Sequence, residues 1–237
     1  MNPDLNCDLG EGESWHVTTG LLERVTSANV ACGGHAGDGA TMRRVLGEAQ
    51  RRGVRVGAHP GISQDFGRGE VTIEPGELDA LLQVQIRRLM RWAEEAGVGL
   101  THVKLHGSLY HAVNRDRVLA WTTLKRVQAE VVDAVMFAPP EGWISRQAAA
   151  IGVEVWAEGF ADRGYQDDGL LVPRGEPGAL LTDAAAVAAR IRHWRRTGAI
   201  ESIGGHQVTL PVRTWCVHGD TPGSPRLAAV VRSALDE

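Results

Sequence analysis

Residues 27–58 read SANVACGGHAGDGATMRRVLGEAQRRGVRVGA, and this stretch indicates the kind of fold. Two short apolar runs within it, 27–31 and 54–58, have the composition of buried strands. Between them Asp38 is a suitable helix N-cap, apolar residues at helical spacing follow it, and Gly53 ends the helix. A strand, a helix and a second strand in this order predict a βαβ unit with parallel strands.

The same alternation continues along the rest of the chain. Further strands are predicted at 4–9, 101–105, 135–138, 153–156 and 214–217, and further helices at 77–95, 116–132, 145–150, 183–195 and 226–235. Seven strands separated by helices predict an α/β fold, namely a distorted seven-stranded (β/α) barrel formed by one domain, 1–237. Two segments interrupt the rhythm: a stretch rich in Gly, Pro and charge at 159–178, and a hairpin at 200–210.

Composition excludes several classes of protein. The chain has 237 residues, and its 43% hydrophobic and 23% charged residues are ordinary for a folded globular protein. A net charge of −4 offers no basic surface for nucleic acid, and no apolar run approaches the roughly 18 residues of a membrane span. The chain runs from Met1 into a strand without a signal peptide, so we expect a cytoplasmic protein with no membrane partner. Three widely spaced cysteines predict buried free thiols.

Ionisable residues recur at the strand ends that would form one mouth of the barrel, where active sites of such barrels lie. Because side chains alternate along a strand, Asn6 and Asp8 share one face, and Lys104 and His106 share another. The opposite face of each strand is apolar, so we expect the polar faces to point into the barrel mouth. The predicted cluster contains Asp8, His35, His59, Lys104, His106, Glu158, His218 and Asp220, with His59 and Glu158 just past their strands.

Three further features indicate binding of an anion or substrate. Lys104 is one of two lysines beside 23 arginines, which indicates a role for a compact point charge on a phosphate or a carbonyl. The run ACGGHAGDGA at 31–40 could hold an anion on its backbone N–H groups, although a plain turn explains it equally well and the chain has no Walker A motif. The stretch 159–174 carries Arg163 and Arg174 and is typical of a lid or binding loop; a solvated surface excursion is the alternative.

Seven segments spread over nearly the whole chain form a specific set. They are DLNCDLGEG (4–12), TSANVACGGHAGD (26–38), VGAHPG (56–61), HVKLHGSLY (102–110), EGFADRGY (158–165), LLVPR (170–174) and CVHGDTPG (216–223). Together they resemble the LamB/YcsF family, to which the A subunit of the bacterial 5-oxoprolinase belongs. The resemblance implies a barrel similar to that of the polysaccharide deacetylases.

The resemblance also implies an activity and partners. It implies an enzyme, a 5-oxoprolinase that opens the cyclic amide 5-oxo-L-proline to L-glutamate while ATP is hydrolysed to ADP and phosphate. Such an enzyme works as a complex, so the resemblance implies partner subunits B and C.

Site residues follow from the positions that match the family motifs. The implied catalytic residues are Asp8, His59, Lys104, His106 and Glu158, and the implied substrate- or phosphate-binding residues are Asn6, Asn29, His35, Arg68, Arg163, Arg174, His218 and Asp220. Asp8, His59 and His106 follow strands in the order of the Asp, His, His metal site of deacetylase barrels, so they are the expected ligands of a divalent metal ion. In the loop 61–70 the family usually has an aromatic residue and paired arginines, whereas this chain has Arg68 alone.

Two other functions stay open on these residues. The same His and Asp cluster, together with the lack of a P-loop, also suits a metal-dependent amide hydrolase or deacetylase that works without ATP. A non-catalytic subunit is expected if the catalytic residues lie in the partners. On the main interpretation, alanine at Asp8 or Lys104 should abolish glutamate formation and leave the thermal midpoint within a few degrees. The segments 159–178 and 200–210 are the expected docking surface.

Overall fold

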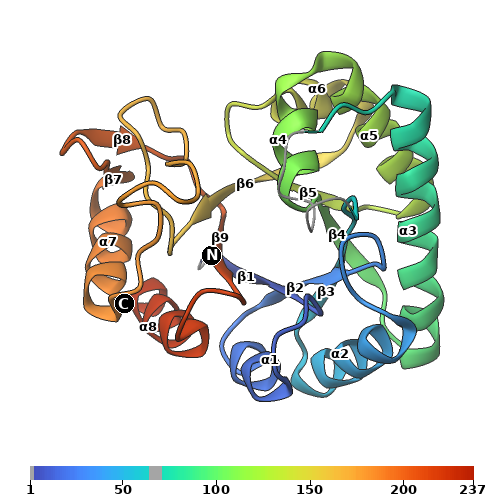
Figure 1. Ribbon diagram of the computed structural model, residues 1–237, viewed down its shortest axis with the longest axis horizontal. Coiled ribbons are helices and arrows are strands. Elements are labelled where there is room, and N and C mark those ends of the chain that lie inside the picture. Colours follow the sequence, from blue (N-terminus) through green and yellow to red (C-terminus); the bar gives the residue numbers. More distant parts are fainter. Residues whose placement is uncertain (1–2, 64–70) are drawn as a thin grey trace.

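The computed structural model describes residues 3–63 and 71–237, and its centre is a closed barrel of parallel strands (Figure 1). The strand order is β1-β2-β3-β4-β5-β6-β9, and β9 closes the barrel by pairing with both β6 and β1. The strands are β1 (Asp4–Leu9), β2 (Ser27–Ala31), β3 (Arg55–His59), β4 (Leu100–Lys104), β5 (Val135–Ala138), β6 (Glu154–Phe160) and β9 (Thr214–His218). The predicted seven-stranded barrel is confirmed.

Helices surround the barrel on its outer side (Figure 1). They are α1 (Trp15–Leu22), α2 (Gly39–Arg52), α3 (Pro75–Ala96), α4 (Gly107–Arg115), α5 (Arg117–Glu130), α6 (Trp143–Ile151), α7 (Ala184–Thr197) and α8 (Ser224–Asp236). Helices α1 and α4, which have eight and nine residues, are not among the helices that the sequence predicts. Within residues 3–63 and 71–237, no helix is long and apolar enough to cross a membrane.

Local signals set the ends of several elements as predicted. Helix α2 starts at Asp38, whose side chain accepts a hydrogen bond from the Thr41 N–H, and stops at Gly53 in the left-handed region. The hairpin consists of β7 (Ala199–Glu201) and β8 (Gln207–Thr209), which pair antiparallel at the periphery of the molecule.

Three strands extend further than predicted, and β9 does so by one residue, to His218. Strand β3 includes His59 as its last residue, and β6 continues to Phe160, so Glu158 lies inside a strand and not in the loop after it. Glu158 and Gly159 are poor strand formers, so composition alone does not predict this extension of β6. Pairing with β9 overrides that preference, since Glu158 is in register with Thr214.

Polar side chains fill the interior of the barrel. Asn29 Nδ2 donates hydrogen bonds to Asn6 Oδ1 (2.7 Å) and Asp8 Oδ1 (2.8 Å). Asn6 Nδ2 in turn donates to Thr214 Oγ1 (2.7 Å) and Glu158 Oε1 (3.1 Å). These side chains are nearly or fully buried, so each must find its partner on another strand. The network therefore links strands β1, β2, β6 and β9 across the inside of the barrel.

His102 belongs to this network and is neutral. The amide nitrogen of Asn29 is occupied, so Asn29 Oδ1 is the acceptor for His102 Nε2 at 2.9 Å, and His102 Nδ1 accepts from the Thr101 hydroxyl at 2.9 Å. The ring stacks on Phe137, and a Cβ on Gly57 would lie 2.2 Å from it, so only glycine fits there. Burial lowers the pKa of His102 from 6.5 to about 3.

This shift predicts a pH-dependent stability. Between pH 6.5 and 3 the unfolded chain binds a proton at His102 that the folded chain does not bind, so the free energy of unfolding falls as the pH falls through this window. Removing the His102 imidazole should therefore reduce the slope of the free energy of unfolding against pH by up to about 1.4 kcal/mol per pH unit. Urea unfolding of His102→Gln and the unmodified protein across the window measures the difference, and equal slopes would contradict the neutral assignment.

Candidate active site

Lys104, Asp8 and Glu158 lie buried together in the barrel mouth, and we call these three residues the ion triad. Lys104 Nζ is 2.8 Å from Asp8 Oδ1, 2.9 Å from Glu158 Oε1 and 3.1 Å from Cys216 Sγ. Burial lowers the pKa of Lys104, but the attraction of Asp8, Cys216 and Glu158 is stronger and raises it well above its usual value. For Asp8 burial acts in the other direction and raises the pKa, but the positive charges of His59 and Lys104 outweigh it, so the pKa of Asp8 lies below its usual value. Lys104 and Asp8 are therefore both charged at neutral pH.

Beside the triad, three histidines converge on one carboxylate. Glu11 Oε1 is 2.7 Å from His35 Nε2, 2.9 Å from His106 Nδ1 and 3.3 Å from His59 Nε2. The rings of His35 and His106 stack with their centroids 3.6 Å apart, and the His59 ring stands perpendicular to both. We call these four residues the Glu11 cluster.

The hydrogen bonds of His59 make the Glu11 cluster suitable for a cation. His59 Nδ1 donates to the Lys104 carbonyl oxygen at 2.8 Å, so a neutral ring turns a lone pair on Nε2 toward His106 Nδ1 at 3.0 Å, Glu11 Oε1 at 3.3 Å and Asp8 Oδ2 at 3.5 Å. Acceptors that face one another in this way need a proton or a metal ion between them. Burial lowers the pKa of His59, yet Asp8 and Glu11 outweigh it and raise the net value.

The donor atoms also have the spacing of a metal site. Histidine and carboxylate ligands about 2.0–2.2 Å from a tetrahedral ion lie about 3.3 Å from each other. The four donor atoms of the Glu11 cluster all lie within 4.8 Å of one another. Of the expected ligands, His59 and His106 belong to this set. Asp8 groups with Cys216 and His218 instead.

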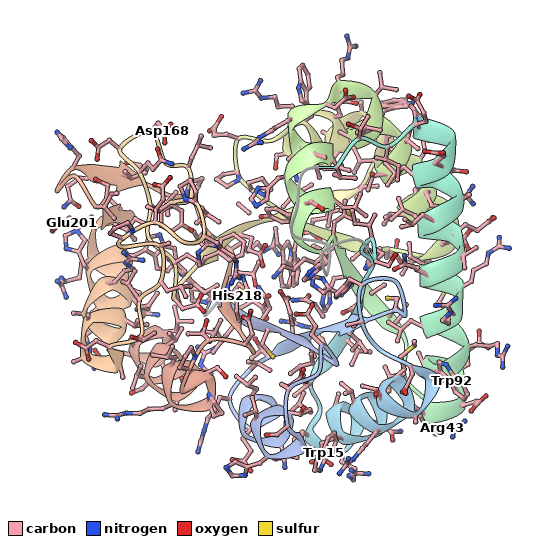
Figure 2. The ribbon with its side chains drawn as sticks, in the orientation of Figure 1. Trp15, Arg43, Trp92, Asp168, Glu201 and His218 are labelled. Atoms are coloured by element: carbon pink, nitrogen blue, oxygen red, sulfur yellow. The ribbon has the colours of Figure 1, made fainter. Side chains whose placement is uncertain are left out.

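A histidine–aspartate pair faces the same mouth from the other side. His218 Nδ1 lies 3.0 Å from Asp162 Oδ1, and the fully buried Asp162 also accepts from the Thr221 hydroxyl at 2.6 Å. Burial raises the pKa of Asp162, but His218 and its hydrogen bonds lower it below the usual value. The charged carboxylate fixes the proton on Nδ1, which leaves His218 Nε2 for the cavity. Figure 2 shows His218 at the end of β9, in the wall of the barrel beside β1.

Residues of all three groups, the ion triad, the Glu11 cluster and the His218–Asp162 pair, line one cavity of about 60 Å³. Its wall includes Asp8, Glu11, His59, Lys104, His106 and His218. The cavity adjoins a larger cleft of about 1150 Å³ along α4, because Gly107, His111, Arg163, Leu171 and Arg174 line both. The structure thus brings together the central residues of the cluster that the sequence predicts.

The remaining predicted residues have more varied places. Arg163 is buried and donates through Nε and Nη2 to the carbonyl oxygens of Ala179 (3.0 Å) and Val172 (2.7 Å), so it braces the 159–178 loop as well as lining the cavity. Arg174 lies at the rim, 3.6 Å from Asp220. Arg68 lies outside the described residues.

The predicted place of Asp220 in the cluster is wrong. Strand β9 ends at His218, so the alternation that should turn Asp220 inward stops two residues earlier, and its side chain is exposed outside the cavity.

Two functional candidates escape the sequence patterns. Glu11 follows β1 in a turn where Gly10 and Gly12 have φ of 81° and 103°, and this turn folds the carboxylate back over the mouth. Asp162 lies two residues past the end of β6, in the predicted binding loop, and only its contact with His218 reveals it. Glu11 stands inside the motif DLGEG and Asp162 inside GFADRGY, so their signal was local sequence and not periodicity.

The fold and the site define a parallel (β/α) barrel with an acid–base cluster at the C-terminal ends of its strands. The chain belongs to the LamB/YcsF family, whose sequence profile matches residues 3–237. It is 43% identical over 238 residues to the 5-oxoprolinase A subunit of Streptomyces avermitilis, covering 98% of this chain and 95% of the relative. It is 41% identical over 241 residues to the protein of the same name from Syntrophobacter fumaroxidans, covering 100% and 95%.

A solved structure agrees with this family membership. The crystal structure of the lactam utilization protein from Thermus thermophilus is similar with a TM-score of 0.91 and 34% identity. The match covers 100% of this chain and 96% of that one.

The ion triad changes the expected effect of alanine at Lys104. Lys104→Ala leaves Asp8 and Glu158 buried without their cation, and breaking a buried pair typically costs about 3–5 kcal/mol. We therefore expect the thermal midpoint to fall by roughly 6–20 °C, not by the few degrees that the sequence suggested. Thermal unfolding measures the shift.

The second lysine provides a matched control. Lys125→Ala removes the same charge from an exposed position on α5 and should change stability by less than about 0.5 kcal/mol. Adding Glu158→Gln to the Lys104 variant should recover part of the loss. If Lys104→Ala and Lys125→Ala unfold at the same temperature, the triad does not stabilise the fold.

Proposed function

We propose that this chain is the A subunit of an ATP-dependent 5-oxoprolinase, which opens 5-oxo-L-proline to L-glutamate while ATP becomes ADP and phosphate. The observation that carries the proposal is the match over nearly the full length to relatives that are named as this subunit of 5-oxoprolinase. The similarity to a solved lactam utilization protein agrees with it, because 5-oxoproline is a five-membered lactam.

The residues of the site suit the chemistry of a lactam. Opening the ring requires a positive group beside the carbonyl oxygen, a base for water and an acid for the departing nitrogen. Lys104 is held charged by Asp8 and Glu158 and supplies the positive group. His218 is oriented by Asp162 and can take up or release a proton at Nε2. ATP is required because hydrolysis of an unstrained lactam is unfavourable, and phosphorylation of the amide oxygen before water attacks would provide the coupling.

A divalent metal ion fits the Glu11 cluster. Glu11, His35, His59 and His106 would hold it, since burial lowers the pKa of His35 to about 4 and keeps that ring neutral for coordination. When bound, the ion would act as a Lewis acid toward an oxygen of the substrate. This ligand set replaces Asp8 of the expected site by Glu11 and His35.

Partner subunits B and C belong to the same proposal. The 159–178 loop and the β7–β8 hairpin form one surface, because the Ile203 N–H donates to the Tyr165 carbonyl at 2.9 Å. Leu170 and Ile203 on this surface are 56% and 57% exposed, which is unusual for large apolar side chains. Figure 2 shows Asp168 and Glu201 at this outer edge, away from His218. We infer that the partners dock there.

The Glu11 cluster also favours a second candidate function. A metal-dependent amide hydrolase acting alone would use the same residues and would need neither ATP nor partners. The two functions differ in one measurable requirement, which is whether release of glutamate depends on ATP.

Reconstitution tests the main proposal. Glutamate release should need this chain, both partners and ATP, and the isolated chain should release little, because alignment of reactants accounts for about 7–11 kcal/mol of such barriers. Release without ATP would favour the lone hydrolase, and steady ATP-dependent release by the isolated chain would contradict the role of the partners.

The histidine–aspartate pair gives a sharper test within the complex. Asp162→Asn should lower kcat by about 10²- to 10⁴-fold, because the amide cannot stabilise a protonated His218. Asp133→Asn is the matched control, since Asp133 is exposed and its φ of 53° suits asparagine. Turnover measured at saturating substrate compares the two, and equal rates would remove His218 from the chemistry.

Metal binding is tested apart from activity. After treatment with a chelator, the full chain should bind one equivalent of Zn²⁺ by calorimetry. Loss of a residue that only hydrogen-bonds a metal ligand weakens metal binding by about 10- to 100-fold. His35→Ala removes a ligand itself, so it should weaken Zn²⁺ binding by more than that. His16→Ala, at an exposed position on α1, should leave the affinity unchanged. Equal affinity in both variants would exclude the Glu11 cluster as the site.

A further inference from the structure

The large cleft beside the catalytic cavity has a use that the acid–base groups do not explain. One wall is formed by α4 through Gly107, Ser108, His111 and Arg115, and the opposite wall includes Arg174. The cleft has about 1150 Å³, which is far more than the 60 Å³ cavity that it adjoins. A ligand in the cleft would therefore lie next to the reacting groups without displacing them.

Helix α4 begins in this cleft without a cap. The side chain of its N-cap residue, His106, makes no capping hydrogen bond and faces Glu11 instead. The N–H groups of Gly107 and Ser108, which line the cleft, have no acceptor among the hydrogen bonds of the described residues. Two unpaired donors and the positive end of the helix dipole favour an anion at this point.

Ser108 is an independent sign of a missing ligand. The residue is 7% exposed and lies in the wall of the cleft, and its hydroxyl oxygen is buried with no hydrogen-bond partner in the described part of the chain. A buried hydroxyl without a partner is unfavourable and therefore uncommon in folded proteins. An oxygen atom of a ligand at the start of α4 would satisfy it.

Among the described residues, the positive charges of the cleft exceed the negative ones. Arg115 makes no ion pair with a described residue, and the ion pair of Arg174 with Asp220 is long at 3.6 Å. The carboxylates in the wall have other tasks: Asp116 caps α5, and Glu74 forms the capping box of α3. The cleft therefore keeps a positive charge that an anionic ligand would neutralise.

We propose that this cleft binds a phosphoryl group, with the start of α4 and the Ser108 hydroxyl on its oxygens and Arg174 at the rim. A phosphate monoester has three acceptor oxygens and a charge of about −1.5 to −2, which matches two N–H groups, one hydroxyl and nearby arginines better than a carboxylate does. The inference rests on the proposed function, in which a phosphoryl group must reach the lactam. The inference places the binding site for this phosphoryl group on this chain and not on the partner subunits.

The position of Arg115 separates two sources of the phosphoryl group. It lies eight residues beyond Gly107, which is about 12 Å along the helix, so it cannot reach a single phosphate at the start of α4. A nucleotide is long enough to meet both ends of the helix. A phosphorylated substrate made by a partner subunit, or free phosphate, would contact only the first turn.

Calorimetry with the isolated full chain tests the inference. The probes are inorganic phosphate, the non-hydrolysable ATP analogue AMP-PNP and L-5-oxoproline, all at constant ionic strength. Ser108→Ala should weaken binding of the phosphate probes by about tenfold and leave 5-oxoproline unchanged, because only phosphoryl oxygens meet that hydroxyl. The thermal midpoint should not fall, since the hydroxyl has no partner to lose.

One arginine variant identifies the source of the phosphoryl group, and a second arginine variant is its control. If AMP-PNP binds and Arg115→Gln weakens it while inorganic phosphate is unaffected, a nucleotide occupies the cleft. If phosphate binds and AMP-PNP does not, the source is a phosphorylated substrate. Arg91→Gln removes the same charge from an exposed position on α3 and should change neither affinity.

The inference is overturned if no phosphate probe binds at millimolar concentration, or if Ser108→Ala binds phosphate as tightly as the unmodified chain. It is also overturned if Ser108→Ala weakens 5-oxoproline alone. These outcomes are separate from the fate of the proposed function. If the complex releases glutamate although this chain binds no phosphate, the proposed function is supported and the phosphoryl site is not. If this chain binds phosphate but the complex releases no glutamate, the phosphoryl site is supported and the proposed function is not.

Discussion

The buried ammonium of Lys104 is the constraint on which the site depends. A charge inside a barrel must be compensated, and here Asp8 and Glu158 do so from strands on either side. Those carboxylates need further donors, which Asn6 and Asn29 supply. One ion in the mouth therefore explains why the interior beside it holds so many polar side chains, whereas most barrels of this kind are filled with branched apolar side chains.

Asp8 connects two histidine systems that differ in their surroundings. On one side its Oδ2 is 3.5 Å from His59, which is drawn into the Glu11 cluster. On the other side it groups with His218, whose proton is fixed by Asp162. The two sides therefore offer different chemistry within one small cavity: a set of ligands that favours a cation, and a single ring nitrogen that is free to exchange a proton.

The sequence predicts the barrel well because strands and their inward faces follow simple periods. The inward direction of Asp8 and Lys104 follows from alternation alone, and the structure has both side chains inside. Alternation fails where a strand ends, which is why Asp220 was misplaced. Glu11 and Asp162 lie in turns, where direction depends on individual φ and ψ angles and on contacts distant in sequence. No periodic pattern describes such positions.

The closure of the barrel by β9 has a consequence for how the protein is made. Asn6 meets Thr214 across 208 residues of sequence, and Lys104 meets Cys216 across 112. At roughly 5–20 residues per second, a ribosome completes β1 tens of seconds before β9 emerges. Until then Asp8 can pair with Asn29 and Lys104, which come earlier in the chain, but the contacts with β9 are missing. The barrel is therefore open beside β1 until late in synthesis, and its mouth is complete only when the last strand brings His218.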